Sequence, residues 1–532
     1  MSLNGIINKG VRIYHTVKFL KLSQVFYQLK YRIATVKSLK PLVAPLHNKH
    51  LAFKVETPQV ASATNDATFN FLNLQVVFNN NIDWDYQGNG KLWNYNLQYF
   101  NYLQQHDLPN HTKQAWLKQI GGWLKDGHLK PEPYPVSLRV MNTIRFITNQ
   151  KQVEPVIIDD LFAQLSYLNH NLEYHILGNH LLENAFALFM GAHFFNMDTW
   201  RQKAKAVLYS ELKEQILNDG AHFELSPMYH QIILFRVLEL ADWYSNADGN
   251  DTVFLTFIKT TAANMLGWLK NITFSNGDIP HFNDSADGIA YNSSQLFEFA
   301  QQLGIKPVTQ LKLAGSGYRK YQFNNYECII DVGAVGPTYQ PGHSHSDALS
   351  FVLYNNSLPV IVDTGTSTYQ IGDKRNHERS TNAHNTVEIE GTNQSEVWGG
   401  FRVGRRAEVT IIKDTANELT AVHNGYQKKF AANHQRNFNF AGDLIQIEDN
   451  ISGSANLVCK ALFHFHPNCN VQIQGNDKVL IDNIATMAFS GATRLEMQHY
   501  EMADGYNKYL PAICLAVSFN NDLKSIIAFT SI

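Results

Sequence analysis

Hydrophobic and polar residues follow different patterns in the two halves of the chain. From about residue 95 to residue 305, apolar residues recur every three or four positions in long segments separated by short polar breaks. Such spacing puts apolar side chains on one face of a helix. The helices predicted from it cover residues 114–125, 137–148, 157–177, 180–195, 199–217, 229–245, 253–269 and 294–303. Long consecutive helices joined by short loops are typical of stacked antiparallel hairpins, as in helical solenoids and α/α toroids.

Beyond about residue 320 the pattern changes to short runs, many of which alternate apolar and polar residues, with Gly, Asn and Asp between them. This alternation is typical of the strands of an antiparallel sandwich. The predicted strands cover residues 327–332, 348–354, 359–362, 386–389, 407–413, 418–423, 444–450, 461–466 and 513–519. The boundary between the two patterns falls near residues 305–320, where Gly304, Pro307, Gly315 and Gly317 cluster.

At 532 residues the chain is too long for one hydrophobic core. We therefore predict an α+β multidomain fold with a basic amphipathic N-terminal segment (residues 1–55), an incomplete α/α toroid (56–315) and an antiparallel β-sandwich (316–532). The formal net charge is -2, so the field of the whole chain attracts neither nucleic acid nor an acidic polymer. Any attraction for a polyanionic glycan has to be local.

The first 55 residues carry positive charge and no carboxylate side chain, because the first acidic residue is Glu56. Apolar residues at roughly helical spacing separate the basic residues Lys9, Arg12, Lys18, Lys21, Lys30, Arg32, Lys37 and Lys40. A basic amphipathic helix of this kind rests on an anionic membrane or a partner, or it packs as a solvated helix on the body of the protein. No apolar run reaches the roughly 18–20 residues that span a bilayer. We expect no signal peptide, because no compact apolar stretch precedes a small-residue cleavage site.

Histidines and aspartates gather at the start of the strand-rich half. His343 and His345 flank Ser344, Asp363 follows a predicted strand, and His384 comes further on. On a strand the two imidazoles of the His-Ser-His triplet would lie on one side, about 7 Å apart, whereas in a loop they can diverge to different tasks. A nearby strand-end aspartate and a third histidine would complete a His/Asp/His set of N and O ligands that suits zinc. The alternative is a group of polar histidines that the surrounding backbone satisfies.

The helical half has a second group of polar residues at two predicted helix starts. Asn179, His180 and Glu183 follow a glycine break, with His180 and Glu183 on one face. Ser226 is a candidate N-cap, which puts Tyr229 in the first turn of the next predicted helix. The positive end of the helix dipole favours the phenolate there and would let Tyr229 act as a base below its usual pKa of about 10. The alternative is a tyrosine that packs at a helix start.

Three stretches join aromatic and hydrogen-bonding residues at helix ends and are candidates for a sugar-binding groove. They cover residues 92–96, 132–139 and 277–284. Taken singly, each is better explained by a structural role. The substrate contacts that we predict from all parts of the chain come from Glu183, Trp93, Tyr134, Arg139, His230 and Arg379.

In order along the chain, these segments resemble the heparinase II/III superfamily of polysaccharide lyases. The resemblance covers most of the chain: residues 92–97, 132–139, 178–184, 219–230, 342–348, 379–387 and 394–406. It implies an α/α toroid joined to an antiparallel β-sandwich, with the site in the cleft between them. It also implies an enzyme, a lyase that cleaves an acidic, uronic-acid-containing polysaccharide by β-elimination.

The resemblance also implies roles for individual residues. Tyr229 would be the Brønsted acid and, for one substrate epimer, also the base, whereas His343 would be the base for the opposite epimer. Asn179 or His180 would neutralise the substrate carboxylate, and of the two we prefer Asn179. Glu183 resembles an acidic neighbour found in part of the family.

A structural zinc ion and a location are further implications of the resemblance. The residues that match the family's zinc set are His345, Asp363 and His384. The basic N-terminus resembles that of relatives that accompany cell-surface polysaccharide production, rather than exported members. This implies a bacterial protein in the cytoplasm or at the inner membrane, with contact through residues 1–55, and the periplasm as the alternative.

Two other functions stay open at this point. A glycoside hydrolase on the same α/α scaffold would use paired carboxylates such as Glu183 and Glu224. A non-catalytic glycan-binding or assembly protein of a surface-polysaccharide pathway would bind without turnover and would tolerate Tyr229→Phe. The hydrolase alternative leaves Tyr229, His343 and the zinc set without roles.

Overall fold

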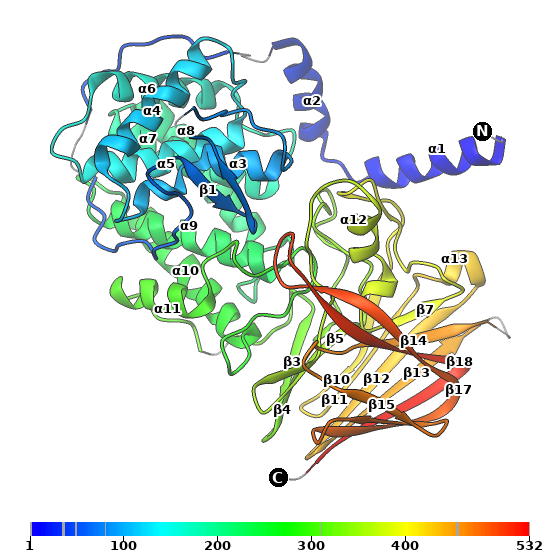
Figure 1. Ribbon diagram of the computed structural model, residues 1–532. Coiled ribbons are helices and arrows are strands. Elements are labelled where there is room, and N and C mark those ends of the chain that lie inside the picture. The colour runs from blue at the N-terminus through cyan, green and yellow to red at the C-terminus, as the bar shows by residue number, and fades with distance from the viewer. Residues whose placement is uncertain are drawn as a thin grey trace.

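The computed structural model describes residues 3–34, 38–47, 51–79, 81–309, 311–453 and 457–530. Lys37 of the basic N-terminal pattern lies outside these ranges. Figure 1 shows a helical half, coloured blue to green, beside a sheet half, coloured green to red. The predicted α+β fold, helices first and antiparallel sheets afterwards, is confirmed.

The helical half is built from all eight helices that the periodicity predicts, and a shorter helix precedes them. Its helices are α3 (Lys91–Tyr99), α4 (Asn110–Lys125), α5 (Pro133–Thr148), α6 (Pro155–His170), α7 (Gly178–Phe194), α8 (Asp198–Gln215), α9 (Pro227–Ser245), α10 (Thr252–Ile272) and α11 (Ser293–Gln302). The predicted helix 157–177 ends early, at His170, because turns and a positive φ at Leu177 lead into α7.

The helices form an inner and an outer layer. Nearly every residue of α5, α7 and α9 is buried, whereas α4, α6, α8 and α10 each bury one face. A helix that is apolar on all sides belongs inside a protein, and an amphipathic helix covers it. Because α5, α7 and α9 lie inside, the polar residues at their N-terminal ends come close together at one end of the toroid.

Two antiparallel sheets make up the sheet half. The smaller one has the order β3 (Tyr318–Gln322), β4 (Tyr326–Asp331), β5 (Phe351–Asn355) and β6 (Leu358–Ile361). The larger one runs in the order β10 (Val409–Asp414), β11 (Glu418–His423), β12 (Asn433–Ala441), β13 (Leu444–Ser452), β18 (Tyr509–Phe529), β17 (Ala485–Ala503), β16 (Lys478–Ile481) and β15 (Val471–Gln474). Off this path, β14 (Cys459–His464) pairs with β18 and with β7 (Val387–Ile389).

Aromatic side chains from the two sheets meet in a shared core, as expected for a sandwich. Tyr321 of β3 stacks on Phe440 of β12 with ring centroids 4.1 Å apart, and Phe351 of β5 contacts Phe438 edge-on. All nine predicted strands are present, whereas β3, β12, β15, β16 and β17 were not predicted. The helix α12 (Asp373–Glu378) interrupts the sheet half beside the cleft described below. Small hairpins come from β1 (Thr68–Phe71) with β2 (Leu74–Val77), and from β8 (Val397–Trp398) with β9 (Arg402–Val403).

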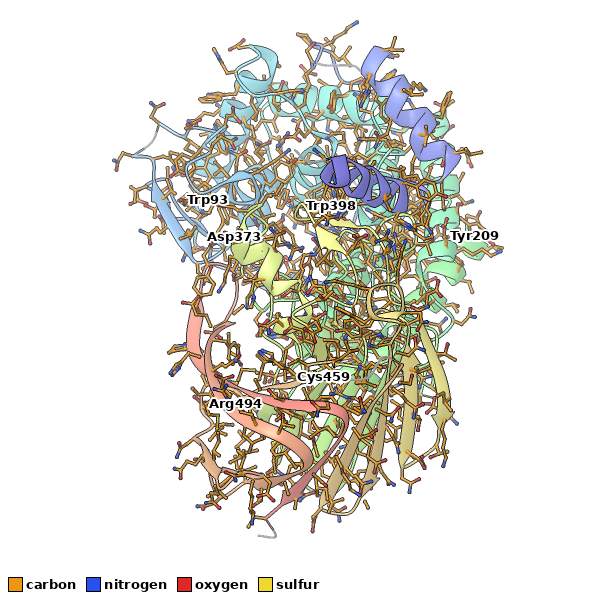
Figure 2. The ribbon with its side chains drawn as sticks, turned by 90° about the vertical axis from the view of Figure 1, so that its right-hand side faces the viewer. Trp93, Tyr209, Asp373, Trp398, Cys459 and Arg494 are labelled. Carbon is orange, nitrogen blue, oxygen red and sulfur yellow. The ribbon has the colours of Figure 1, made fainter. Side chains whose placement is uncertain are left out.

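The basic N-terminal segment forms two helices, α1 (Leu3–Val17) and α2 (Leu22–Ala34), that pack against different halves. In α1, Thr16 Oγ1 accepts a 3.2 Å hydrogen bond from the Trp398 indole of the sheet half, and Figure 2 shows Trp398 next to α1. In α2, Gln24 donates to the carbonyl oxygen of Ile176 in the helical half at 3.3 Å. None of the helices in the described ranges is both long enough and apolar enough to cross a membrane.

Candidate functional site

A cavity of about 1450 Å³ opens between the two halves. Its walls come from α3, α5, α7 and α9, from loops of the sheet half near residues 339–343 and 368–371, and from α1 and α2. Pockets for a drug-sized ligand have about 300–1,000 Å³, so this cleft has room for a larger ligand. Tyrosines are prominent in its lining: Tyr95, Tyr99, Tyr134, Tyr229, Tyr291, Tyr339, Tyr369 and Tyr506.

Tyr229 reaches the cleft from the first turn of α9. The Ser226 hydroxyl caps this helix by accepting the backbone N–H of Tyr229 at 3.2 Å, as predicted. The Tyr229 hydroxyl lies 3.2 Å from that of Tyr369. Burial raises the pKa of Tyr229, so the expectation of a stabilised phenolate was wrong. The desolvation of the charged form outweighs the helix dipole, and the phenol is a proton donor at neutral pH.

His343 faces Tyr229 from the sheet half. The two rings lie with their centroids 4.0 Å apart, so the helical half and the sheet half contribute neighbouring acid–base groups to one cleft. Nδ1 of His343 lies 2.8 Å from Oδ2 of Asp284, and Nε2 lies 3.8 Å from Glu224 Oε2. When Nδ1 carries the hydrogen and donates it to the Asp284 carboxylate, the lone pair of Nε2 is free to accept a proton.

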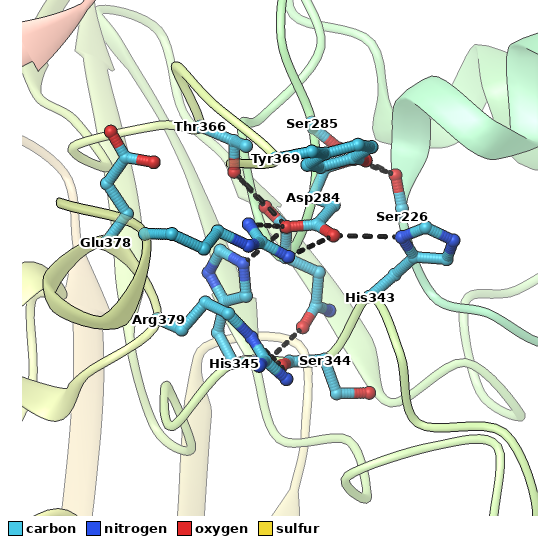
Figure 3. Close-up of polar contacts among 12 residues, drawn as sticks. Ser226, Asp284, Ser285, His343, Ser344, His345, Thr366, Tyr369, Glu378 and Arg379 are labelled. Atoms are coloured by element: carbon cyan, nitrogen blue, oxygen red, sulfur yellow. Dashed lines mark hydrogen bonds and ion pairs between the residues drawn. The ribbon is translucent and has the colours of Figure 1, made fainter. Parts of the chain in front are cut away.

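Asp284 lies at the centre of the polar contacts in Figure 3. Its second oxygen is 2.8 Å from Nε2 of His345, and the Arg375 guanidinium donates to both oxygens, to Oδ2 at 2.6 Å. The side chain is fully buried. Burial alone would raise the pKa of Asp284, but Arg375 and the two histidines hold it well below its usual value. Asp284 is therefore an ionised carboxylate that ties His343 to His345.

Asn179 and His180 lie side by side at the start of α7, and both line the cleft. The Asn179 amide donates to both oxygens of Glu224, at 3.0 and 2.8 Å. His180 is more exposed, and its Nδ1 lies 3.1 Å from Glu173 Oε1. Although burial would lower it, the pKa of His180 is raised by Glu173. This pair therefore brings a neutral amide and an imidazole with a raised pKa to one spot of the cleft wall.

Glu183 belongs to a buried ion-pair network rather than to a free carboxylate pair. Arg236 Nε donates to its two oxygens at 3.2 and 3.0 Å, and Arg236 also pairs with Glu239. Glu183 lines the cleft but its side chain is fully buried. Glu224 is equally buried and is held by Asn179. Because both carboxylates are engaged, the geometry lends no support to the paired acid and base of a hydrolase.

Of the six predicted substrate contacts, Tyr134 and Glu183 line the cleft and four residues do not. Trp93 is buried in the aromatic core, where its indole donates to the Leu74 carbonyl oxygen. Arg139 is buried among helices and donates to Gln164 and to the Gln98 carbonyl oxygen.

His230 and Arg379 are the other two predicted substrate contacts that do not line the cleft. His230 Nε2 bonds the Met265 carbonyl oxygen, and burial lowers the pKa of His230 to about 3. Arg379 donates twice to the Ser344 carbonyl oxygen, at 3.1 and 2.8 Å, and so holds the loop that carries His343 and His345. Each of the four was predicted from its place in a polar segment, which does not reveal the direction of the side chain.

A compact group of ligand-type atoms lies behind His343. His345, Asp347 and His384 each offer one N or O atom, and these atoms lie within 4.8 Å of one another. Among the residues that the structure describes, His345 Nδ1, Asp347 Oδ2 and His384 Nε2 are buried without a hydrogen-bond partner. Unpartnered buried polar atoms are costly, and a cation would satisfy all three.

Asp363 lies beside this group, in contact with His384, and the zinc set His345, Asp363 and His384 stays a prediction. Oδ2 of Asp363 lies 2.8 Å from Nδ1 of His384, and Oδ1 accepts the Gly365 N–H. This is the arrangement in which a carboxylate orients a metal-ligating histidine. The sequence reasoning missed Asp347, although it stands two positions after His345 in the same polar segment.

Comparison with known families adds a decisive observation. The model for the heparinase II/III N-terminus matches residues 59–303, and the model for the heparinase II/III-like C-terminal domain matches residues 307–525. The chain belongs to the heparinase II/III family. Both halves of the cleft therefore come from domains of this family.

Relatives of this heparinase II/III protein share modest sequence identity with it. A heparin-sulfate lyase of Bacteroides stercoris is 23% identical over 339 residues, which are 56% of this chain and 49% of the relative. The chain spans about half the length of the curated relatives that it matches. A heparinase III structure aligns with a TM-score of 0.62 at 18% identity and covers 85% of this chain and 81% of its own. Heparan sulfate lyase HepC from Pedobacter heparinus aligns with a TM-score of 0.57 at 19% identity over 86% of this chain and 80% of its own.

Proposed function

We propose that this protein is a polysaccharide lyase that cleaves a uronic-acid-containing glycan by β-elimination. The observation that carries the proposal is the approach of Tyr229 and His343 to 4.0 Å between ring centroids in a large cleft. Membership of the heparinase II/III family supports it, and relatives with that fold are named heparin-sulfate lyases.

The first requirement of the reaction is to stabilise the substrate carboxylate. Removal of the proton at C5 places a second negative charge beside an ionised carboxylate, so C5 is barely acidic until donors neutralise that group. We assign this task jointly to Asn179 and His180. His180 supplies the positive charge, and the N-terminal end of α7 adds its dipole at the same place. The amide of Asn179 is already shared with Glu224, which makes His180 the stronger of the two donors.

The proton transfers then follow from the two neighbouring rings. Nε2 of His343 takes the C5 proton, the electrons of the C5–H bond form the C4–C5 double bond, and the C4–O4 bond breaks. Tyr229 gives its phenolic proton to the departing O4, because its raised pKa keeps it protonated until then. The Tyr369 hydroxyl, 3.2 Å away, stabilises the resulting phenolate. The proposal applies to the C5 epimer whose proton faces His343, since a protonated Tyr229 cannot also serve as the base.

We further propose that His345, Asp347 and His384 hold a zinc ion with a structural role. Two imidazoles and a carboxylate are ligands that zinc prefers. Burial raises the pKa of both Asp331 and Asp347, which disfavours their ionised forms. When bound, the ion would supply a fixed positive charge that stabilises these carboxylates. His345 would then be held by the ion on one side and by Asp284 on the other. This arrangement fixes the loop from which His343 reaches the cleft.

A screen of uronic-acid polysaccharides by ultraviolet absorbance tests the proposed function. The unsaturated uronate product absorbs, whereas the ends released by a hydrolase do not. We expect one class of polymer to give rising absorbance with the wild-type protein and none with Tyr229→Phe. If every polymer leaves the absorbance flat while one still binds to both proteins, the chain is a glycan-binding protein and not a lyase.

A further inference from the structure

The helix α2 is packed with its polar side towards the protein and its apolar side towards solvent. Gln24 is only 2% exposed and bonds the Ile176 carbonyl oxygen, and Tyr27 stacks on Tyr174 with centroids 4.6 Å apart. The opposite side presents large apolar residues at helical spacing, with exposed fractions of 89% for Leu22, 60% for Phe26, 56% for Leu29 and 90% for Ile33. Positions three and four apart lie on one face of a helix.

The apolar surface continues beyond α2. Ile13, Tyr14 and Val17 of α1 are exposed, as are Val43 and Leu46 after α2. Among the residues that the structure describes, 11 of the 24 exposed large hydrophobic side chains lie between Ile13 and Leu46. Scattered exposed apolar residues need no explanation, but their concentration in one short stretch of the chain indicates an interaction site.

The charges around this patch are positive. Lys9, Lys18, Lys30 and Arg32 are exposed, and no acidic residue occurs before Glu56. Two other basic residues are used to attach the helices, because Lys21 pairs with Glu214 and Arg12 pairs with Glu396. Aliphatic and aromatic side chains flanked by lysine and arginine match the headgroup region of an anionic membrane. A symmetric contact between two copies of the chain would instead bring like charges together.

We propose that the patch formed by the outer faces of α1 and α2 binds the surface of an anionic lipid bilayer. In this arrangement α2 lies parallel to the membrane, with Leu22, Phe26, Leu29 and Ile33 in the interface and the basic side chains at the phosphates. The inference goes beyond the proposed lyase function and does not depend on it.

The position of the helices relates this membrane contact to the cleft. Thr16 of α1, Gln24 and Gln28 of α2, and Leu20 between the two helices belong to the cleft wall. A bilayer bound to the outer faces therefore lies behind one wall of the cleft. The glycan that this arrangement favours is one held close to a membrane surface.

Vesicle flotation of the full-length protein tests the proposal. We expect the wild-type protein to float with vesicles of phosphatidylcholine and phosphatidylglycerol, and to float less at high salt because the charges are screened. The triple variant Leu22→Ser, Phe26→Ser, Ile33→Ser should bind about tenfold more weakly. A matched control, Val253→Ser with Leu358→Ser, removes side chains that are 78% and 63% exposed elsewhere and should float like the wild type. Thermal melts of all three proteins check that they are folded.

Several outcomes would overturn the proposal. These are wild-type protein that stays at the bottom of the gradient, a triple variant that floats as well as the wild type, and equal binding to pure phosphatidylcholine vesicles. Sedimentation velocity adds a further one. If the wild-type protein forms a dimer that the triple variant loses, and neither binds lipid, the patch is an interface between two copies of the chain.

Discussion

The carboxylate of Asp284 lies 2.8 Å from Nδ1 of His343 and fixes the ring of the proposed base. We predict that Asp284→Asn lowers kcat by about 10²–10⁴-fold with a small change in KM, since the amide no longer holds the tautomer with Nε2 free. Steady-state kinetics on the polymer found by the screen measures the effect.

A matched control separates this role from the loss of a buried ion pair. Asp449 is also fully buried and accepts from Arg436 and His434, but it lies in the sandwich and does not line the cleft. Asp449→Asn should lower the melting temperature as Asp284→Asn does, while kcat of the folded protein stays near the wild-type value. Equal kcat in wild type and Asp284→Asn would contradict the assigned role.

Tyr369 gives a graded test of the proton donor. Its hydroxyl makes one hydrogen bond to that of Tyr229, and a single neutral hydrogen bond contributes about 0.5–1.5 kcal/mol. Tyr369→Phe should therefore lower kcat by roughly 2- to 10-fold, far less than Tyr229→Phe. A loss as large as that of Tyr229→Phe would mean that Tyr369, and not Tyr229, protonates the leaving group.

The pair of His180 and Glu173 makes a pH-dependent contribution to stability. The pKa of His180 is raised above 6.5, so its contribution is complete below pH 6.5 and is lost as pH rises through the raised value. The pKa of Glu173 is lowered below 4.5 by His180 although burial opposes this, so its contribution is complete above pH 4.5 and is lost in more acidic solution. The free energy of unfolding of the wild type should exceed that of His180→Gln most between these two pH values. Urea denaturation at several pH values measures the difference, and a pH-independent difference would show that the pair is not charged.

Metal content distinguishes Asp347 from Asp363. We expect one equivalent of zinc in the purified protein and its loss in Asp347→Asn. Asp363→Asn should weaken zinc binding by about 10–100-fold, as expected for a residue that only orients a ligand. Elemental analysis and chelator titration measure both effects, with a fall in melting temperature on metal removal. Wild-type protein without stoichiometric zinc, or an Asp363 variant that loses more zinc than the Asp347 variant, would refute the assignment.

The sequence was sufficient for the larger features of the fold. Helices such as α10 and strands such as β13 were predicted because their apolar periodicity is strong, and Ser226 marks the start of α9. The long hairpin of β17 and β18 was mostly missed. None of its β17 residues between Ala492 and Glu501 is buried, so this stretch has no buried face of the kind on which the prediction depends.

The residues of the candidate site could be predicted only where they belong to a sequence motif of the family. Tyr229 and His343 were recognised, and the structure brings them together. Asp284 was not, because its role depends on His343 and Arg375, which are 59 and 91 positions away in the chain. Trp93 shows the converse error, since an aromatic residue in a polar stretch can equally face the core.

The most direct test of the central claim is the mass of the products from a defined uronic-acid oligosaccharide cleaved by the wild-type protein. Elimination adds no water, so the masses of the two fragments should sum to the mass of the substrate, and neither fragment should form with Tyr229→Phe. Fragments whose masses sum to that of the substrate plus one water molecule, or unchanged cleavage by Tyr229→Phe, would contradict the proposed elimination by Tyr229 and His343.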